Sequence, residues 1–160
     1  GEQELFGQHD PTWLDDDRLL IFDNGMGRPG GDSFSRVVEV ELPMDGARPR
    51  ATDASQVPPS PSWTWTMDGF YAPLTSGAQR LPGGGTLISD GPGGHLLEID
   101  AAGEVVWDYV NPVTAERVLP ASEAPEPGAN AIFKARRYGP NDPELLGLDL
   151  SASALLVAEE

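Results

Sequence analysis

Two copies of one sequence unit lie in this chain of 160 residues, and this repeat restricts the fold more than any other feature. In each copy an apolar residue leads into a tight turn, a run rich in aliphatic residues follows, and Asp and Gly end the run. The first copy covers residues 13–25 and the second covers residues 80–91. Repetition of this kind is typical of folds that stack copies of one small structural unit.

The pattern of each copy predicts four short strands. We expect them near residues 10–14, 18–23, 35–42 and 62–67 in the first copy, and near 77–81, 85–90, 94–100 and 104–110 in the second. Residues 15–17 and 82–85 are rich in Asp and Gly, which tolerate the backbone angles of hairpin turns. Short strands grouped in fours are typical of propeller blades. The sequence therefore predicts an all-β fold with two four-stranded antiparallel blades, at residues 8–67 and 76–110.

The other segments depart from the repeat. Residues 43–61 contain few apolar side chains and several prolines, so we expect an exposed excursion between the third and fourth strands of the first blade. Residues 111–160 form a C-terminal tail of the same domain. Within it we expect a loop at 120–128, a strand or short helix at 131–138, a turn at 140–143 and a closing strand at 151–158.

Composition narrows the classes of function. The net charge of −16 repels phosphate backbones and anionic lipids, so binding of nucleic acid or of a membrane surface is not expected. No apolar run approaches the length of about 18 residues that a membrane span needs. The absence of cysteine excludes disulfides, thiolate metal sites and cysteine nucleophiles. A chain that starts at Gly1 without a signal-peptide pattern is expected to begin at a processing or fragment boundary.

Several stretches of the chain form an ordered set: residues 7–10, 20–25 and 35–39 in the first copy, residues 70, 76–82, 86–88 and 105–112 in the second, and residues 130–138 in the tail. Together they resemble the arylsulfate sulfotransferase family. The most specific element is His9-Asp10 followed by Phe22-Asp23-Asn24-Gly25, in order with the rest.

The resemblance implies a fold and an activity. Members of the family are six-bladed propellers, usually periplasmic, that move a sulfuryl group from an aryl sulfate to a phenol through a sulfohistidine. It therefore implies a periplasmic or extracellular protein with small-molecule aryl sulfate and phenol partners, and with no metal or other cofactor. This chemistry combines a histidine nucleophile with fixed donors that face the developing charge.

Three residues are candidates for the site by this resemblance. His9 matches a family histidine that binds sulfate or the departing oxygen; the alternative is a histidine hydrogen-bonded to the adjacent turn. Arg28 resembles the sulfate-binding arginine, and its forked donors suit sulfate; alternatively it is a solvated loop residue paired with a carboxylate. Asn24 is a candidate for oxyanion binding, or else it stabilises the turn before Gly25.

The other polar residues are expected to serve the structure. Asp10 and Asp23 suit turn capping or pairing with arginine, and His95 suits a surface or interblade position. No histidine lies between His9 and His95 or after His95. The resemblance thus gives no position in this chain for the nucleophilic histidine of the family, and we expect it on a blade outside the chain.

Two blades cannot close a ring, and open blades leave apolar faces and sheet edges uncovered. We therefore expect the remaining blades of a six-bladed ring to come from an N-terminal portion, a second chain or further copies of this chain. Two functions stay open at this stage. One is sulfuryl transfer, and the other is a non-catalytic propeller that binds a small anion or a protein partner.

Overall fold

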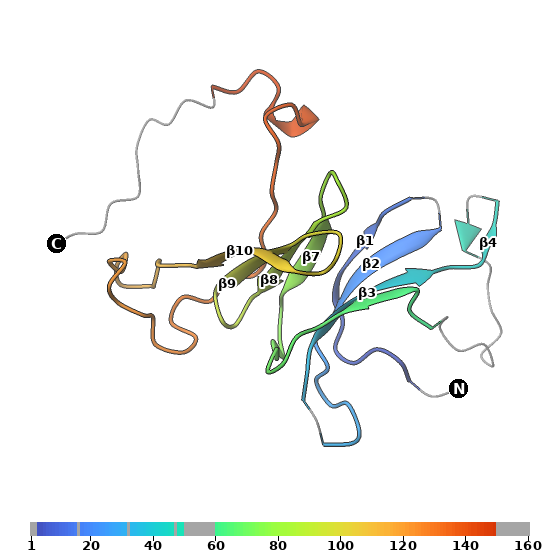
Figure 1. Ribbon diagram of the computed structural model, residues 1–160, viewed down its shortest axis with the longest axis horizontal. Coiled ribbons are helices and arrows are strands. Elements are labelled where there is room, and N and C mark those ends of the chain that lie inside the picture. The colour runs from blue at the N-terminus through green and yellow to red at the C-terminus, as the bar shows by residue number, and fades with distance from the viewer. Residues whose placement is uncertain (1–2, 16, 32, 47, 50–59, 150–160) are drawn as a thin grey trace.

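The computed structural model describes residues 3–15, 17–31, 33–46, 48–49 and 60–149, which form two four-stranded antiparallel sheets (Figure 1). The first sheet contains, in spatial order, β1 (His9–Trp13), β2 (Arg18–Asp23), β3 (Arg36–Glu41) and β6 (Trp63–Trp65). The second contains β7 (Gly77–Arg80), β8 (Thr86–Asp90), β9 (His95–Ile99) and β10 (Val105–Val110). The predicted all-β class and both four-stranded antiparallel units are confirmed.

The strands of the first sheet are apolar on both faces. Leu20 and Phe22 of β2 point to one face and Ile21 to the other, and all three are buried. In β3 the buried Val37 and Val38 likewise face opposite ways. Aliphatic and aromatic side chains favour extended backbone, and burial on two faces explains why the run is continuous rather than alternating. The sheet therefore buries apolar side chains on both of its faces.

One core joins the two sheets. Its buried side chains come from both sheets and from the connection between them: Leu20, Phe22, Val37, Trp65, Phe70, Ala72, Ala78, Ile88, Leu97 and Ile99. Phe70, in the connection, meets Phe22 and Trp65 edge-on, with ring centroids 5.9 and 5.6 Å apart. The indole N–H of Trp65 donates to the carbonyl of Gly103, 3.0 Å away, in the β9–β10 turn.

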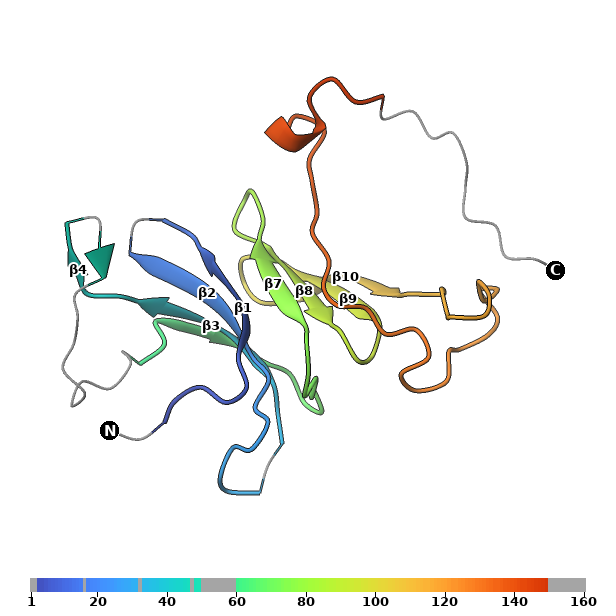
Figure 2. The same cartoon turned by 180° about the vertical axis from the view of Figure 1, so that it is seen from behind.

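The first strands of the two sheets lie side by side. β7 contacts both β1 and β2, whereas β10 forms the far edge of the second sheet (Figures 1 and 2). His9 opens β1 and Gly77 opens β7, so the two sheets bring their first strands together at corresponding positions. This arrangement places His9 beside the junction between the sheets.

The turn between β1 and β2 is held by an ion pair. Asp15 accepts hydrogen bonds from the backbone N–H of Arg18 at 3.0 Å and from its Nε at 2.8 Å. The side-chain hydrogen bond from Arg18 lowers the pKa of the Asp15 carboxyl, and the carboxylate in turn raises the pKa of Arg18. The ion pair therefore stabilises the charged forms of both Asp15 and Arg18.

The excursion at residues 43–61 connects β3 to β6, as predicted, but it also contains a two-stranded hairpin. β4 (Met44–Asp45) pairs with β5 (Arg48–Pro49), and Gly46, with φ of 61°, supplies the left-handed conformation of the turn. Strands of two residues are too short for a recognisable apolar pattern, which is why the sequence did not indicate them. Residues 50–59 lie outside the described part of the chain.

The tail departs from its prediction at residues 131–138, which form neither a strand nor a helix. Their backbone groups bond to a loop and to side chains instead of a ladder: Ile132 donates to the Gly91 carbonyl at 2.9 Å, and Ala135 donates to the Ser89 hydroxyl at 3.0 Å. The loop at 120–128 and the turn at 140–143 have no strand or α-helix, and the 3₁₀ turn η1 (Pro143–Leu145) follows. The predicted closing strand at 151–158 lies outside the described residues.

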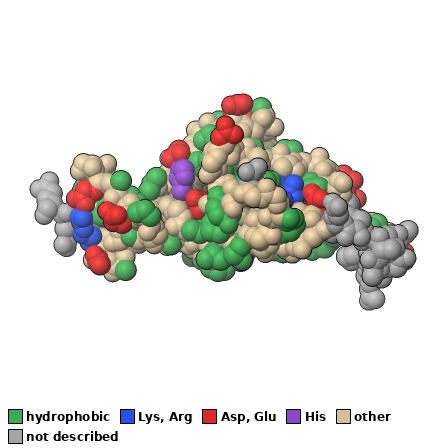
Figure 3. Space-filling view, turned by 90° about the horizontal axis from the view of Figure 1, so that it is seen from below, with side chains coloured by type: hydrophobic (Ala, Val, Ile, Leu, Met, Phe, Trp, Pro, Cys, Tyr) green, Lys and Arg blue, Asp and Glu red, His purple; other side chains and the backbone are tan. Residues whose placement is uncertain are grey.

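Trp107 lies in β10, the edge strand of the second sheet, and no other described sheet packs on it. The side chain is 43% exposed and stacks on Tyr109, with centroids 5.6 Å apart and planes 4° from parallel. Every residue of β10 is exposed, because no described sheet covers the outer face at this edge. Figure 3 shows hydrophobic side chains gathered at the surface in the middle of one face of the molecule.

Candidate functional site

His9 begins β1 at an irregularity of the sheet. His9 pairs with Phe22 and Thr12 pairs with Leu20, so the β1 side holds one residue more than the β2 side between these pairs. The bulge contains Asp10, whose φ of 54° is positive, and Pro11, which has no N–H to leave unpaired. Bulges turn the adjacent side chain away from its regular direction and are frequent beside functional sites. The Asp10-Pro11 bulge thus separates His9 from the regular pairing of the rest of β1.

The imidazole of His9 is held in one tautomer. Its Nδ1 lies 2.9 Å from the Gly7 carbonyl oxygen and 2.7 Å from Oδ1 of Asn24. Both oxygens only accept hydrogen bonds, so Nδ1 must carry the hydrogen. In the neutral ring the lone pair then lies on Nε2, which makes no hydrogen bond to any residue that the structure describes. A histidine of this form offers a nucleophilic or proton-accepting nitrogen.

Asn24 fixes this arrangement from a fully buried position. Its amide Nδ2 donates to the carbonyls of Ala72 at 2.7 Å and Thr75 at 3.0 Å, which orients Oδ1 toward His9. The side chain therefore uses both of its N–H groups and its oxygen within the chain. Binding of an oxyanion by Asn24, the role given by the resemblance, would require one of these bonds to break.

Arg28 follows the turn at Gly25 and is nearly buried, with 13% of its side chain exposed. Its Nη2 donates to Asp23 Oδ2 at 2.7 Å, and its guanidinium lies over the rings of Phe6 and Phe34, 5.0 and 4.3 Å from their centroids. No hydrogen bond among the described residues joins Arg28 to His9 or Asn24. The structure thus does not directly link the two predicted catalytic residues.

Asp23 organises the segment next to the site. Its carboxylate is fully buried and accepts from Arg28, from Nε of Arg36 at 2.8 Å and from the backbone N–H of Phe6 at 2.8 Å. The pairing with arginine expected for Asp23 is thus present. A buried carboxylate needs such partners, because it would otherwise lack the solvation that water provides.

The backbone around His9 is strained. Among the described residues, Asp10, Thr75 and Ser76 are the only ones other than glycine with positive φ, at 54°, 49° and 76°. Each such conformation costs about 1–3 kcal/mol and persists only where its surroundings hold it. Asp10 follows His9, and the Thr75 carbonyl accepts from the amide that holds His9. The strain is therefore concentrated at one place.

Thr75 and Ser76 were not among the predicted site residues. Ser76 lies opposite His9 in the repeat, and this correspondence was the signal available in the sequence. In the structure its hydroxyl accepts from the Gly91 N–H at 3.0 Å and donates to the Leu74 carbonyl at 3.0 Å. Its contribution is to hold the connection between the two sheets.

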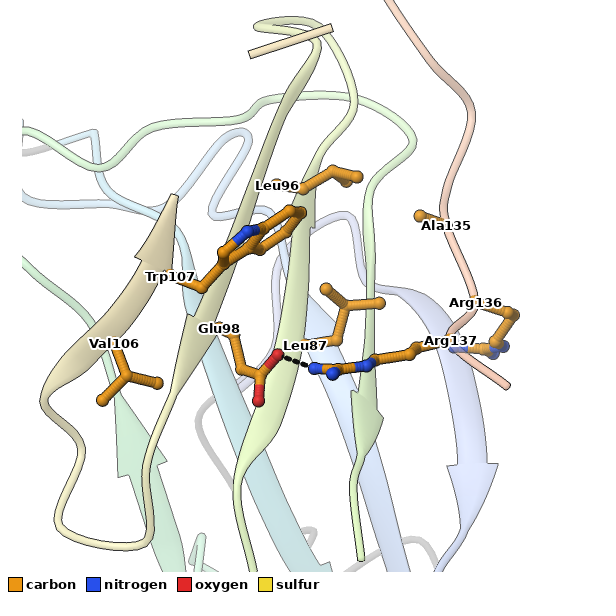
Figure 4. A pocket seen from close by; sticks show the side chains of 8 residues that line it. All are labelled: Leu87, Leu96, Glu98, Val106, Trp107, Ala135, Arg136 and Arg137. Atoms are coloured by element: carbon orange, nitrogen blue, oxygen red, sulfur yellow. Dashed lines mark hydrogen bonds and ion pairs between the residues drawn. The ribbon is translucent and has the colours of Figure 1, made fainter. Parts of the chain in front are cut away.

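A concave region lies on the outer face of the second sheet. This groove, of about 560 Å³, is lined by Leu87, Leu96, Glu98, Val106, Trp107, Ala135, Arg136 and Arg137 (Figure 4). Leu87, Leu96 and Trp107 make its walls apolar, and the ion pair between Arg137 and Glu98 crosses it. His9 is not among the residues that line this groove, so the groove and the His9 site are separate features.

The described residues offer neither a metal cluster nor a membrane-spanning helix. The described part of the chain contains no group of three His, Cys, Asp or Glu side chains arranged to hold a metal ion. Nor does it contain a helix with the length and hydrophobicity of a membrane span. His95 Nε2 lies 2.9 Å from an Asp108 oxygen on the neighbouring strand, at the surface, as expected for that residue.

Comparisons with known proteins give no relative for this chain: no family model, curated protein or solved structure matches it.

Proposed function

We propose that this chain forms two blades of an arylsulfotransferase-like propeller and contributes His9 to the site of sulfuryl transfer from an aryl sulfate to a phenol. The observation that carries the proposal is the fixed tautomer of His9, which leaves the Nε2 lone pair without a partner among the described residues. In such a reaction an imidazole nitrogen forms a bond to sulfur while the bond from sulfur to the aryl oxygen breaks. The oxygen of the acceptor phenol then bonds to sulfur as the bond from sulfur to nitrogen breaks, and the phenol proton passes to a histidine nitrogen of the site.

The hydrogen bond from Nδ1 supports this chemistry. When Nε2 takes the proton of the acceptor phenol, the ring becomes positively charged while Nδ1 retains its hydrogen. Asn24 Oδ1 and the Gly7 carbonyl accept that hydrogen and stabilise the charged ring. The sulfuryl group is then carried by another histidine of the assembly, on a blade outside this chain.

The packing of the repeats supports the propeller. The face of the first sheet that packs on the second sheet includes Leu20, Val37 and Trp65. The corresponding residues of the second copy are Leu87, Leu96 and Tyr109, which lie on its outer face. Leu87 and Leu96 line the groove there. In the first sheet this face is covered by the second sheet. In the second sheet the corresponding face is open to solvent.

The opposite faces correspond as well. The second sheet packs on the first through Ile88, Leu97 and Ile99, among others. Their counterparts in the first copy are Ile21, Val38 and Val40, which form a separate apolar cluster on the other face of the first sheet. Each sheet thus has one apolar face that matches the packed face of the first sheet and one that matches the packed face of the second. Head-to-tail stacking of such units generates a ring when further units are added.

The test of the enzymatic function uses the assembly that contains this chain. Release of a coloured phenol from its sulfate ester is measured with and without an acceptor phenol. We expect His9→Ala to abolish acceptor-dependent release, because the nitrogen that takes the proton of the acceptor phenol is removed. His95→Ala, which changes a surface histidine, should retain it. Unchanged turnover in the His9→Ala assembly would reject the proposed role of His9.

A non-catalytic propeller that binds a small anion or a protein partner is the alternative, and one observation favours it. Arg28 is engaged by Asp23 and two phenyl rings, and Asn24 uses its whole amide within the chain. Fewer donors are then free for a transition state than the resemblance implies. The same assay separates the two functions, since an assembly that binds aryl sulfate without releasing phenol is a binding protein.

A further inference from the structure

We propose that the tail segment at residues 130–137, which we call the strap, is part of the His9 site and that Asp10 is the positioning residue through which it acts. The proposal rests on the proposed function only in taking His9 as the reactive group. What the strap controls is the conformation of the bulge at Asp10 and hence the direction and tautomer of the imidazole.

The strap is fixed to the second sheet along its length. The backbone N–H of Ser76 donates to the Phe133 carbonyl at 3.0 Å, and Nη1 of Arg136 donates to the Ala78 carbonyl at 2.9 Å. The side-chain amide of Gln79 both donates to the Arg137 carbonyl at 2.9 Å and accepts from its N–H at 2.7 Å. These bonds make the strap a rigid extension of the second sheet.

From this support the strap reaches the first sheet at the bulge. Oδ1 of Asp10 accepts from Lys134 Nζ at 2.7 Å and from Arg136 Nη2 at 2.8 Å. The Asp10 side chain is only 6% exposed, so two charge-assisted hydrogen bonds act on it with little competition from water. They hold a residue whose positive φ would otherwise be unfavourable.

The contact leaves no room for adjustment on the opposite side. A Cβ atom on Gly77, the first residue of β7, would lie 2.4 Å from Oδ2 of Asp10. The carboxylate is therefore confined between the strap and the start of β7. Because Asp10 follows His9 directly, its confinement fixes the backbone from which the imidazole reaches Asn24 and Gly7.

The composition of the strap agrees with this role. Lys134, Arg136 and Arg137 are three of only ten basic residues in a chain of net charge −16, and Lys134 is its only lysine. Arg137 pairs with Glu98 in the second sheet, whereas Lys134 and Arg136 converge on one carboxylate of the first. The cations thus join the sheets at the residue next to His9.

The tautomer of His9 can be measured directly by ¹⁵N NMR of the full chain with labelled histidine. The two histidines give two sets of signals, which His95→Asn assigns. In the unaltered chain we expect His9 as the Nδ1–H form, since Nδ1 faces two acceptors. In Asp10→Asn we expect this signature to be lost in favour of the mixture of free imidazole, in which Nε2–H predominates. Asparagine tolerates positive φ, so this variant weakens the contact with the strap without adding backbone strain of its own.

Three further variants separate positioning from general damage. Lys134→Met with Arg136→Met should give the same loss from the side of the strap, while Lys134→Arg should retain the Nδ1–H signature. Asp108→Asn changes the carboxylate beside His95 and should move only the His95 signals. Unchanged His9 signals in both Asp10→Asn and the double variant, with the His95 signals in place, would overturn the proposal. Because this readout requires no sulfuryl transfer, it can fail while the proposed function stands, and the reverse is also possible.

Discussion

Asn24 is the residue on which the candidate site depends most. It lies fully buried between the two sheets, and its amide bonds the connection at Ala72 and Thr75 on one side and His9 on the other. The resemblance assigned it to a ligand, whereas the structure shows it bonded within the chain. Its side chain therefore supports both the stability of the junction and the tautomer of His9.

We expect Asn24→Ala to destabilise the chain by about 1–3 kcal/mol, because it removes the donor of the buried Ala72 carbonyl and of the part-buried Thr75 carbonyl. The same change should release His9 from the Nδ1–H form. Urea unfolding gives the first effect and histidine ¹⁵N shifts give the second. Asn141→Ala, at an exposed position, should alter stability by less than about 0.5 kcal/mol. Equal stability of the two variants would contradict the role given to Asn24.

At the same scale, the sequence could identify His9 but not its partners. The His-Asp pair is visible because it precedes a strand and recurs in an ordered set of motifs. His9 donates to the backbone carbonyl of Gly7 and to the side-chain amide of Asn24, which two further backbone carbonyls orient. Every residue has a backbone carbonyl, so the sequence does not indicate which ones take part. The pairing of Asp10 with Lys134 spans 124 positions in a chain of 26 acids, so charge alone does not select it.

The strands, in contrast, were largely predictable. Alternation, aliphatic runs and Gly or Asp turns located all eight strands of the two sheets because each signal lies within a few residues of the strand it defines. The tail was not predictable in this way. Its conformation comes from contacts with turns of the second sheet, chiefly through Asn130, which is buried and exchanges two hydrogen bonds of 2.9 Å with Asn111.

The β8–β9 turn provides a test of how the tail is held. Gly94 has φ of 58°, and a Cβ there would lie 2.3 Å from the carbonyl oxygen of Asn130. We expect Gly94→Ala to cost more than about 2 kcal/mol, since it adds displacement of Asn130 to the backbone strain. Gly128→Ala is the matched control: its φ is 80°, but no atom lies within 4 Å of the added Cβ, so only the strain of about 1–2 kcal/mol remains. Thermal unfolding of both variants gives the comparison, and equal losses would show that the tail does not press on this turn.

At the scale of the whole molecule, the residues that the structure describes leave one sheet face open. All of β10 is exposed, and Val106 and Trp107 border an apolar groove on that face. Soluble chains that keep such surfaces uncovered tend to associate. The correspondence between the two copies explains why the surface is apolar, since the same face of the first sheet is buried against its neighbour.

We therefore expect the isolated chain to associate through β10 instead of persisting as a compact monomer. Light scattering over a dilution series measures the mass, and a combined Val106→Glu and Trp107→Glu variant should shift it toward the monomer. Leu146→Glu, which changes a side chain 72% exposed in the tail, should leave association unchanged. A cooperatively melting monomer of the unaltered chain at low concentration would contradict this expectation.

The hydrogen bond from Arg136 to Asp10 links residues 126 positions apart, and this separation has a consequence for the order of events during synthesis. A ribosome that adds about 5–20 residues per second takes roughly 6–25 s to proceed from Asp10 to Arg136. For that interval the first sheet can pair its strands, but the bulge beside His9 has no cation to hold it. The histidine near the start of the chain is thus among the last groups to be set in place.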